Sequence, residues 1–343
     1  MTLAIRAPEA WLGPGRLVRD AEIVCDRGDI LSAGARVESG DHDEILELDG
    51  FLMPAVADRH VHIELSDPAA VLLRGVTAVR DLAWPAERIF PLADASELPT
   101  YTGPLVRAAG PMLTGRGGYP TRDAWAPAGT GRELDGPDDA RMAVKELASL
   151  GAAAIKVSLN AEAGPTPSDA ELAAVCEEAH AHDLPVTAHA QGHGQVERGL
   201  GAGIDELAHT PWTERVSDDL LDACARRLRI VSTLDIFSFG RDTPEIRTAL
   251  DNLRRFHTAG GTVIYGTDLG NGAIPPGIDT REALLLAEAG LEYEEVLEAM
   301  VRATLEPGAP ADVVGFRASP LDDLAALDDL RLVVRGGGVA LAR

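Results

Sequence analysis

The residues with the clearest chemical potential are two histidines that a single valine separates. His60 and His62 follow an apolar stretch at residues 51–56, and the alternation of apolar and polar residues around them predicts a β-strand. Side chains two positions apart on a strand lie on the same face, so the two imidazoles would stand next to each other. Because neutral imidazole is a common nitrogen ligand of zinc and related cations, the pair is a candidate half of a metal site. Two solvated or hydrogen-bonded histidines at a strand end are the simpler alternative.

Other potential metal ligands occur at the ends of later predicted strands, namely Lys156, His189, His209 and Asp268. Each of them has an ordinary explanation on its own. A buried histidine can be satisfied by hydrogen bonds, an aspartate can serve a turn, and a lysine can extend its ammonium group into solvent. The ends of parallel strands in a barrel nevertheless converge on one rim, where barrel enzymes keep their active sites. The recurrence at strand ends therefore favours one shared site.

Predicted strands and helices alternate from residue 51 onward. After the first strand, seven more are predicted, at residues 75–81, 105–110, 152–157, 185–189, 204–209, 229–234 and 262–268. Capping residues and apolar periodicity predict helices between most of them, for example at 137–150 and from Ser168 to His182. This order predicts an α/β protein with a (β/α)8 TIM-like barrel over residues 51–305. Strands predicted in residues 1–50 and 306–343 indicate a small β-sandwich domain that both chain termini form together.

A long loop rich in glycine and proline follows the third predicted strand, at residues 114–137. A loop of this length in a compact domain usually has a function of its own. An arginine in it, Arg116 or Arg122, could bind a substrate carboxylate, and Tyr119 could donate a hydrogen bond to an oxyanion. A surface loop with solvated charges is an equally good interpretation. Weaker candidates for substrate contact follow later strands and are Gln191, His193 and Thr233.

The composition excludes several classes of protein. The net charge of −24, from 31 basic and 55 acidic residues, argues against nucleic acid and anionic membranes as partners. No apolar run approaches the roughly 20 residues that span a bilayer, and the first residues lack the pattern of a signal peptide. The three cysteines form no Cys-x-x-Cys motif, which fits a reducing cytoplasm. We expect a cytoplasmic protein with a small-molecule substrate, and a homo-oligomer is compatible with the sequence.

The stretches around these residues resemble the amidohydrolase superfamily, and most closely its imidazolonepropionase-like and prolidase-like branch, in which the fourth barrel strand carries a lysine. The resemblance runs over nearly the whole chain and is carried by residues 53–62, 75–81, 188–192, 206–209 and 266–268. Two departures stand out. The family usually has a glycine where this chain has Ala55, and the segment between Thr304 and Pro307 is short.

The resemblance implies that Lys156 is carboxylated and bridges two divalent cations, for which zinc is the expected metal. One cation would take His60, His62, Lys156 and Asp268, and the other would take Lys156, His189 and His209. A free ammonium group, with a pKa of ~10.4, would repel cations, whereas a carbamate is an anion that can bridge them. An unmodified Lys156 beside a single metal remains the alternative.

The activity that the resemblance implies is the hydrolysis of a carbon–nitrogen bond in a dipeptide-like or cyclic amide. A hydroxide that bridges the two metals would attack the carbonyl carbon, and Asp268 would move the proton to the leaving nitrogen. Three alternatives stay open at this point: a lactonase or ester hydrolase with the same binuclear site, a deaminase with one metal, and a non-catalytic relative. Gln191 stands where deaminases usually carry an acidic residue, which speaks against the second of these.

Overall fold

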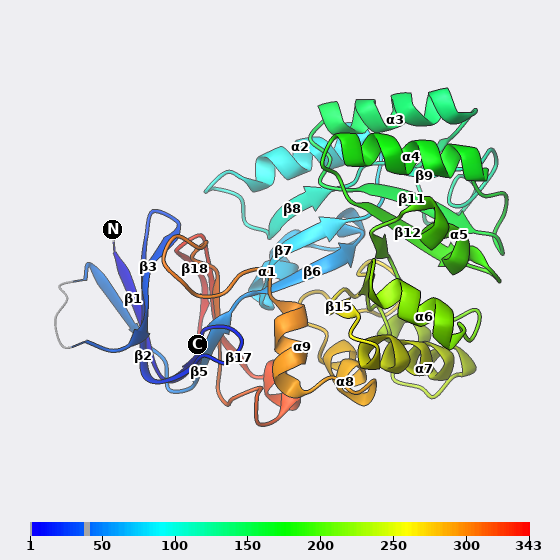
Figure 1. Cartoon of the computed structure of the whole chain (residues 1–343). Helices are drawn as coiled ribbons and strands as arrows, with labels where there is room; N and C mark the ends of the chain where they lie inside the picture. The colour runs from blue at the N-terminus through cyan, green and yellow to red at the C-terminus, as the bar shows by residue number, and fades with distance from the viewer. Residues whose placement is uncertain (1, 38–41) are drawn as a thin grey trace.

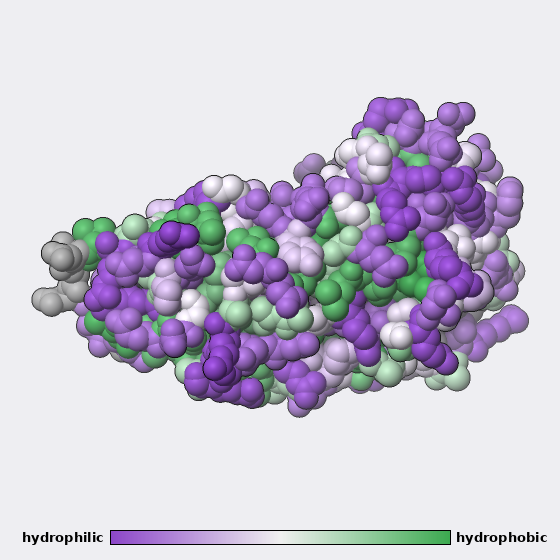
Figure 2. Space-filling model, turned by 90° about the horizontal axis from the view of Figure 1, so that it is seen from below, coloured by the Kyte–Doolittle hydropathy of each residue, from purple (hydrophilic) through white to green (hydrophobic). Residues whose placement is uncertain are grey.

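The computed structural model describes residues 2–37 and 42–343. Its strands form three sheets of eight, seven and three strands. Figure 1 shows an all-β part that contains both termini and an α/β part that contains the other two sheets. On the face drawn in Figure 2, hydrophilic residues cover most of the surface, with smaller apolar areas between them. Within the described residues, no helix is long and apolar enough to cross a membrane.

Segments from both ends of the chain share the eight-stranded sheet, in the order β18-β17-β16-β5-β1-β2-β3, with β4 paired to β1. Strand β5 pairs with β1 in parallel and with β16 in antiparallel orientation, so it joins the N-terminal and C-terminal strands. The strands are β1 (Leu3–Trp11), β2 (Leu17–Asp26), β3 (Asp29–Ala35), β4 (Glu44–Glu47), β5 (Phe51–Pro54), β16 (Val313–Phe316), β17 (Leu330–Arg335) and β18 (Gly338–Ala342). Their inward residues, such as Ile5, Ile23, Val313 and Leu332, form a separate apolar core.

All strand pairs of the α/β part are parallel, which confirms the predicted class. The three-stranded sheet contains β6 (Val56–Val61), β7 (Val76–Asp81) and β8 (Leu105–Ala108). The seven-stranded sheet contains β9 (Met112–Thr114), β10 (Gly131–Glu133), β11 (Ile155–Asn160), β12 (Val186–Gln191), β13 (Glu206–Leu207), β14 (Arg229–Val231) and β15 (Thr262–Ile264). Strands β9 and β10 flank the long glycine-rich loop, which the sequence had indicated only as a loop.

Helices connect most of these strands: α1 (Pro68–Leu73), α2 (Ala86–Ser96), α3 (Pro137–Ser149), α4 (Asp169–Ala181), α5 (Gln195–Ala202), α6 (Asp218–Ala225), α7 (Pro244–Thr258), α8 (Thr280–Glu288) and α9 (Tyr293–Met300). Capping residues explain where several of them begin. The predicted capping box of Ser168 and Glu171 starts α4, and the Thr243 hydroxyl accepts a backbone hydrogen bond at the start of α7. The helices bury their apolar faces against the strands in one large core.

Backbone hydrogen bonds connect the two parallel sheets at their edges. The His62 N–H donates to the Leu269 carbonyl at 2.7 Å, and the Asp268 N–H donates to the His60 carbonyl at 2.8 Å. On the other side, the Ala153 N–H before β11 donates to the Ala108 carbonyl of β8 at 2.8 Å. The first bonds place the end of β6 directly beside the segment that follows β15. The residues at these two strand ends therefore come together although they lie two hundred positions apart.

Candidate metal centre

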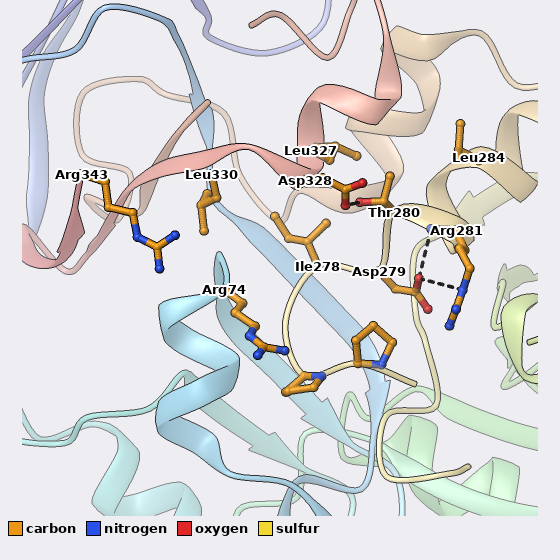
Figure 3. Close-up of a pocket in the computed structure, with 12 residues that line it drawn as sticks. Arg74, Ile278, Asp279, Thr280, Arg281, Leu284, Leu327, Asp328, Leu330 and Arg343 are labelled. Atoms are coloured by element: carbon orange, nitrogen blue, oxygen red, sulfur yellow. Dashed lines mark hydrogen bonds and ion pairs between the residues drawn. The ribbon is translucent and has the colours of Figure 1, made fainter. Parts of the chain in front are cut away.

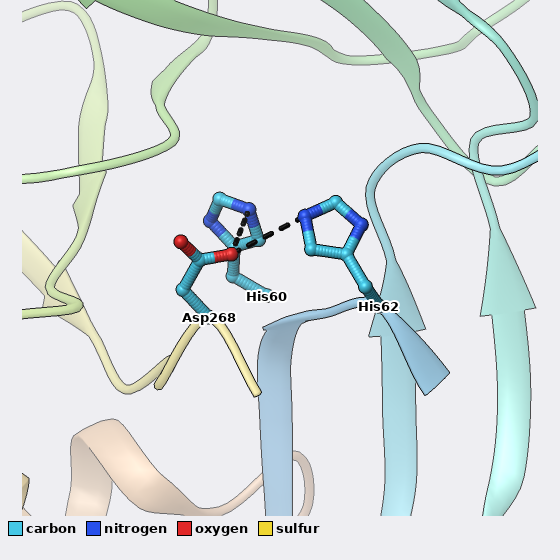
Figure 4. A group of neighbouring side chains, drawn as sticks. All are labelled: His60, His62 and Asp268. Atoms are coloured by element: carbon cyan, nitrogen blue, oxygen red, sulfur yellow. Dashed lines mark ion pairs between the residues drawn. The ribbon is translucent and has the colours of Figure 1, made fainter. Parts of the chain in front are cut away.

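The end of β6 and the segment after β15 bring three metal-binding side chains together (Figure 4). The Nε2 atoms of His60 and His62 each lie 3.3 Å from the Asp268 Oδ1 atom. One ligand atom from each residue lies within 4.8 Å of the others, and the three residues are at most 6% exposed. Two imidazole nitrogens and a carboxylate oxygen are a typical donor set for zinc.

Hydrogen bonds at the far side of each ring fix the orientation of the two histidines. The Nδ1 atom of His60 lies 2.7 Å from the Ala208 carbonyl oxygen, and that of His62 lies 3.1 Å from the Ala83 carbonyl oxygen. A carbonyl oxygen only accepts, so each Nδ1 carries a proton that it donates. This leaves both Nε2 atoms directed towards Asp268, which is how metal-binding histidines are usually held.

A second pair of histidines lies beside the first group. The Nδ1 atom of His189, on β12, is 2.9 Å from the Nε2 atom of His209, which follows β13. The His60 and His209 ring centroids are 4.6 Å apart, so all four histidines form one cluster. The predicted substrate contact Thr233 instead holds His209, because its hydroxyl lies 2.8 Å from the His209 Nδ1 atom.

Lys156 is fully buried, and its Nζ atom has no hydrogen-bond partner among the described residues. The prediction that Lys156 ends its strand is wrong, because β11 spans Ile155–Asn160 and Lys156 is its second residue. Register pairs Lys156 with Thr187 and Ser158 with His189, so the lysine backbone lies two residues deeper than the histidine. Its charge still acts on the pKa of His60, His189 and His209, so the long side chain reaches their surroundings.

Burial determines the protonation of these groups. It lowers the pKa of Lys156 from 10.5 to about 7 and that of His189 to about 3. It also lowers the pKa of His60 and His209 well below the usual value, with the Lys156 charge contributing to both shifts. Burial acts in the same direction on the pKa of His62, but the hydrogen bond and charge of Asp268 outweigh it and raise that pKa. At neutral pH most of the cluster is therefore neutral, as metal ligands must be.

Comparison with known proteins agrees with this geometry. Residues 51–304 match the family model described as the amidohydrolase family. This chain belongs to the amidohydrolase family. No curated protein matches its sequence significantly.

Solved structures with the same fold cover nearly the whole chain. A Xaa-Pro dipeptidase with methionine bound in its active site is 20% identical, with a TM-score of 0.84 and 99% coverage of each chain. Ochratoxinase from A. niger is 20% identical, with a TM-score of 0.84, over 99% of this chain and 96% of that one. A prolidase complexed with N-methylphosphonate-L-proline is 21% identical, with a TM-score of 0.81 and full coverage of both chains. At this identity the likeness shows the fold.

Two buried aspartates that sequence reasoning did not single out position the ligands of this amidohydrolase. Asp58 accepts the backbone N–H of His60 at 3.0 Å, the N–H of Thr267 at 3.1 Å, and the Thr267 hydroxyl. It thereby ties the strand that carries His60 to the segment that carries Asp268. Asp81 accepts the backbone N–H groups of Ile63 and Ala83, at 2.8 and 3.2 Å, and so holds the turn after His62. Asp58 follows a predicted strand and Asp81 ends one, and this position at a strand end is the sequence feature that could have identified them.

The glycine-rich loop covers the histidines with aromatic rings. Tyr119 stacks on His189 with centroids 5.1 Å apart, and Trp125 packs on His62 at 4.7 Å. Sequence reasoning had named Tyr119 but had missed Trp125. Gln191 also lies at the cluster, where its side chain hydrogen-bonds to His189. These residues are therefore placed to meet a substrate above the metal-binding groups.

The other predicted substrate contacts lie at the surface. Arg116 forms an ion pair with Asp135 at 2.9 Å, and both side chains are largely exposed. Arg122 is also exposed and lies against Gly117, where its Nη2 atom would be 3.0 Å from an added Cβ. The imidazole of His193 is 96% exposed and 3.7 Å from Glu214. In the part of the chain that the structure describes, no hydrogen bond, ion pair or ring contact joins these three side chains to the histidine cluster.

Two cavities lie away from the histidines. One of about 580 Å³ is lined by Arg74, which follows α1, by Asp279 and Arg281 at the start of α8, and by residues of the C-terminal segment such as Asp328 (Figure 3). Two of its polar side chains are bound to each other, since the Thr280 hydroxyl donates to Asp328 at 2.6 Å. The other, of about 440 Å³, includes Arg59, Arg80 and Arg229 around the buried Glu206. Buried carboxylate oxygens without a hydrogen-bond partner also occur at Asp279 and Glu282, but within the described residues only His60, His62 and Asp268 form a close group of three metal-binding side chains.

Proposed function

We propose that this chain is a metal-dependent hydrolase that cleaves a carbon–nitrogen bond in an amide, either dipeptide-like or cyclic. The observation that carries the proposal is the convergence of the His60 and His62 Nε2 atoms on Asp268, beside the facing nitrogens of His189 and His209. Family membership supports an activity of this class. The Asp268 Oδ1 atom faces the two histidine Nε2 atoms, and the Lys156 Nζ atom lacks a hydrogen-bond partner in the described structure, so Asp268 and a carboxylated Lys156 would fit a bound cation.

A closed (β/α)8 barrel is the architecture that we propose for the catalytic part. The eight barrel strands would be β6, β7, β8 and β11 to β15, with the short strands β9 and β10 on either side of the long loop. The backbone hydrogen bonds between β6 and residues 265–269 support closure at one edge, and the Ala153–Ala108 bond supports it at the other. Residues 1–50 and 306–343 would form the companion domain, with β5 as the strand that leads into the barrel.

Two divalent cations, with zinc as the expected metal, would be held by His60, His62, Asp268, His189, His209 and a carboxylated Lys156. When bound, they would lower the pKa of a coordinated water and polarise the substrate carbonyl. The lysine is suited to carboxylation, because a pKa of about 7 leaves much of the amine neutral at physiological pH. The amine nitrogen would attack the carbon of CO2, a C–N bond would form, and a proton would leave the nitrogen. The product is a carbamate anion.

Asp268 would move the proton in the reaction. Its carboxylate would take a proton from the attacking water and then give it to the leaving nitrogen, so that the amine departs neutral. The Tyr119 hydroxyl accepts a hydrogen bond from Trp125 and keeps its own proton for the developing oxyanion. Gln191 is placed to contact the substrate next to His189. Thr233 would act through His209 rather than on the substrate.

Asp268→Asn tests the proposal. In zinc-loaded protein assayed against N-acyl amino acids, dipeptides, cyclic amides and lactones, we expect about two metal ions per chain in both wild type and variant. Turnover should fall about 10²–10⁴-fold in the variant, because the proton acceptor is lost. Asp219→Asn, on the exposed start of α6, is the control and should behave as wild type. Full activity of Asp268→Asn, or lactone hydrolysis alone, would contradict the proposal.

A further inference from the structure

The cavity of about 580 Å³ lies where the α/β part meets the all-β part (Figure 3). One wall comes from the α/β part, with Arg74 after α1 and residues of the segment that leads into α8. The other wall comes from the C-terminal part, with Leu327 and Asp328 before β17 and Arg343 after β18. Cavities of this size between two parts of a protein are common sites for small ligands.

The middle of this cavity is apolar. Ile278 and Leu330 line it and are partly buried, and Leu284 is 44% exposed. Gly75 allows the two walls to approach each other, because an added Cβ there would be 2.6 Å from the Ile278 Cδ1 atom and 3.4 Å from the Leu330 Cδ1 atom. An alkyl chain bound in the cavity would remove these apolar side chains from water, which is favourable.

Two guanidinium groups of the cavity have no acidic partner. Within the described residues, the side chains of Arg74 and Arg343 form neither an ion pair nor a hydrogen bond. The third arginine of the lining, Arg281, is held by Asp235, whose Oδ2 atom lies 2.6 Å from the Arg281 Nη2 atom. The backbone of Arg343 is fixed, because its N–H donates to the Arg331 carbonyl at 2.9 Å. The cavity therefore offers two free guanidinium groups to a ligand carboxylate.

The carboxylates of the cavity lie apart from these arginines. Figure 3 shows the two free guanidinium groups on one side of Ile278 and the carboxylates on the other. The Asp328 Oδ1 atom accepts the Thr280 hydroxyl at 2.6 Å, and the other oxygen of this exposed carboxylate has no partner in the described structure. Asp279 is buried and caps the start of α8. Asp328 is therefore the carboxylate that a ligand ammonium group can reach.

We propose that this cavity binds a zwitterion whose charged ends are separated by a short alkyl chain, of the class of the ω-amino acids. Arg74 and Arg343 would bind its carboxylate, and Asp328 would bind its ammonium group. The alkyl chain would lie on Ile278 and Leu330. Free groups of both signs line the cavity, each on its own side, which favours this ligand over a simple anion or cation.

The proposed site is separate from the histidine cluster, since no residue of the cluster lines the cavity. The proposal therefore does not depend on the proposed hydrolytic function. Three six-carbon probes test it by calorimetry in chelator-treated protein, in which neither turnover nor a bound metal interferes. 6-Aminohexanoate carries both charges, hexanoate carries only the carboxylate, and hexylamine carries only the ammonium group. Glycine is a zwitterion that is too short to reach both sides of the cavity.

We expect saturable binding of 6-aminohexanoate, roughly tenfold tighter than that of hexylamine, which lacks the group that the two arginines bind. It should also be several-fold tighter than that of hexanoate or glycine, because an exposed carboxylate such as Asp328 contributes less. Asp328→Asn keeps an acceptor for the Thr280 hydroxyl and should weaken 6-aminohexanoate binding without weakening hexanoate. Arg74→Gln and Arg343→Gln should weaken both of these ligands without weakening hexylamine.

Asp222→Asn and Arg227→Gln, at exposed positions of α6 and of the turn after it, are the matched controls and should bind every probe as wild type. Hexanoate, hexylamine or glycine binding as tightly as 6-aminohexanoate, or no saturable binding of it, would overturn the proposal. Binding that Asp268→Asn abolishes would also overturn it, because the ligand would then lie at the histidine cluster. Binding that follows the cavity variants in a protein without hydrolase activity would uphold the cavity site and contradict the proposed function.

Discussion

Replacing Lys156 by methionine should make the metal-free protein more stable while removing its function. The side chain is fully buried, and its Nζ atom has no hydrogen-bond partner in the described structure. An amine in such a position destabilises the fold unless it is neutral, carboxylated or paired. Methionine has a similar length and volume without the charge, so it fills the same space. The substitution removes the cost of the amine and with it the proposed bridging ligand.

The size of the effect follows from the pKa of Lys156, which burial lowers from 10.5 to about 7. The folded state favours the neutral amine, so its destabilising contribution is largest below pH 7, declines as the pH rises towards 10.5, and is absent above that value. At pH 7 the contribution is about 4 kcal/mol as an upper limit, since one pKa unit corresponds to about 1.4 kcal/mol. We therefore expect Lys156→Met to raise the free energy of unfolding of the metal-free protein by up to that amount.

Urea unfolding of chelator-treated protein at pH 7 and pH 10 measures this difference, and elemental analysis of zinc-loaded protein measures the metal content. The methionine variant should gain stability mainly at pH 7, bind less metal, and lose turnover. Lys145, exposed on α3, is the only other lysine of the chain, so Lys145→Met is a matched control with little expected effect. A methionine variant that is less stable than wild type, or that keeps its full metal content, would refute the reasoning.

Two further predictions concern buried carboxylates. Burial raises the pKa of Glu282 from 4.5 to about 8, so the folded state favours the neutral acid, and its contribution to stability is present below pH 4.5 and lost as the pH rises through 8. Glu282→Gln should therefore reduce the decline in unfolding free energy between pH 5 and pH 8.5, by at most about 5 kcal/mol. Urea titrations measure the decline, and Glu288→Gln, at an exposed position, is the control that should leave it unchanged. Asp58→Ala leaves two backbone donors and the Thr267 hydroxyl without an acceptor, so we expect a loss of about 2–4 kcal/mol in unfolding free energy and weaker zinc binding. Thr267→Val removes one of these bonds and the acceptor of the Leu269 N–H, so it should cost about 1–2 kcal/mol. Equal losses in the two variants would show that Asp58 does not hold both segments.

The alternation of strands and helices was readable because buried parallel strands are apolar and helices begin at capping residues. The capping box at Ser168 is an example, since side chain and backbone satisfy each other locally. The first and last residues of the strands and helices were less predictable. The strand expected at 152–157 begins only at Ile155, because Ala152 to Ala154 are as apolar as the strand that follows. Helix α9 ends at Met300, where Val301 forms a bridge with Val56 that local sequence does not encode.

The candidate ligands were readable for a related reason. Histidines and an aspartate at the ends of parallel, adjacent strands must approach one another, and this does not depend on the conformation of the loops. The loop residues lack such a constraint. Arg116 forms an ion pair with Asp135 away from the histidines. Trp125, which no sequence pattern had identified as a site residue, packs on His62. Their positions depend on contacts made after the loop has folded onto the rest of the chain.

The segment that carries Asp268 shows how backbone geometry completes the site. Gly266 allows this segment to lie against β6, because an added Cβ would be 2.4 Å from a Val231 methyl and 3.1 Å from the His60 backbone nitrogen. Asp268 itself adopts a left-handed conformation, with φ of 59°, which is unfavourable for a residue other than glycine and is held by its surroundings. The Asp58 carboxylate secures the same segment through Thr267. These contacts bring His60, His62 and Asp268 together, which is the arrangement that the proposed cation site requires.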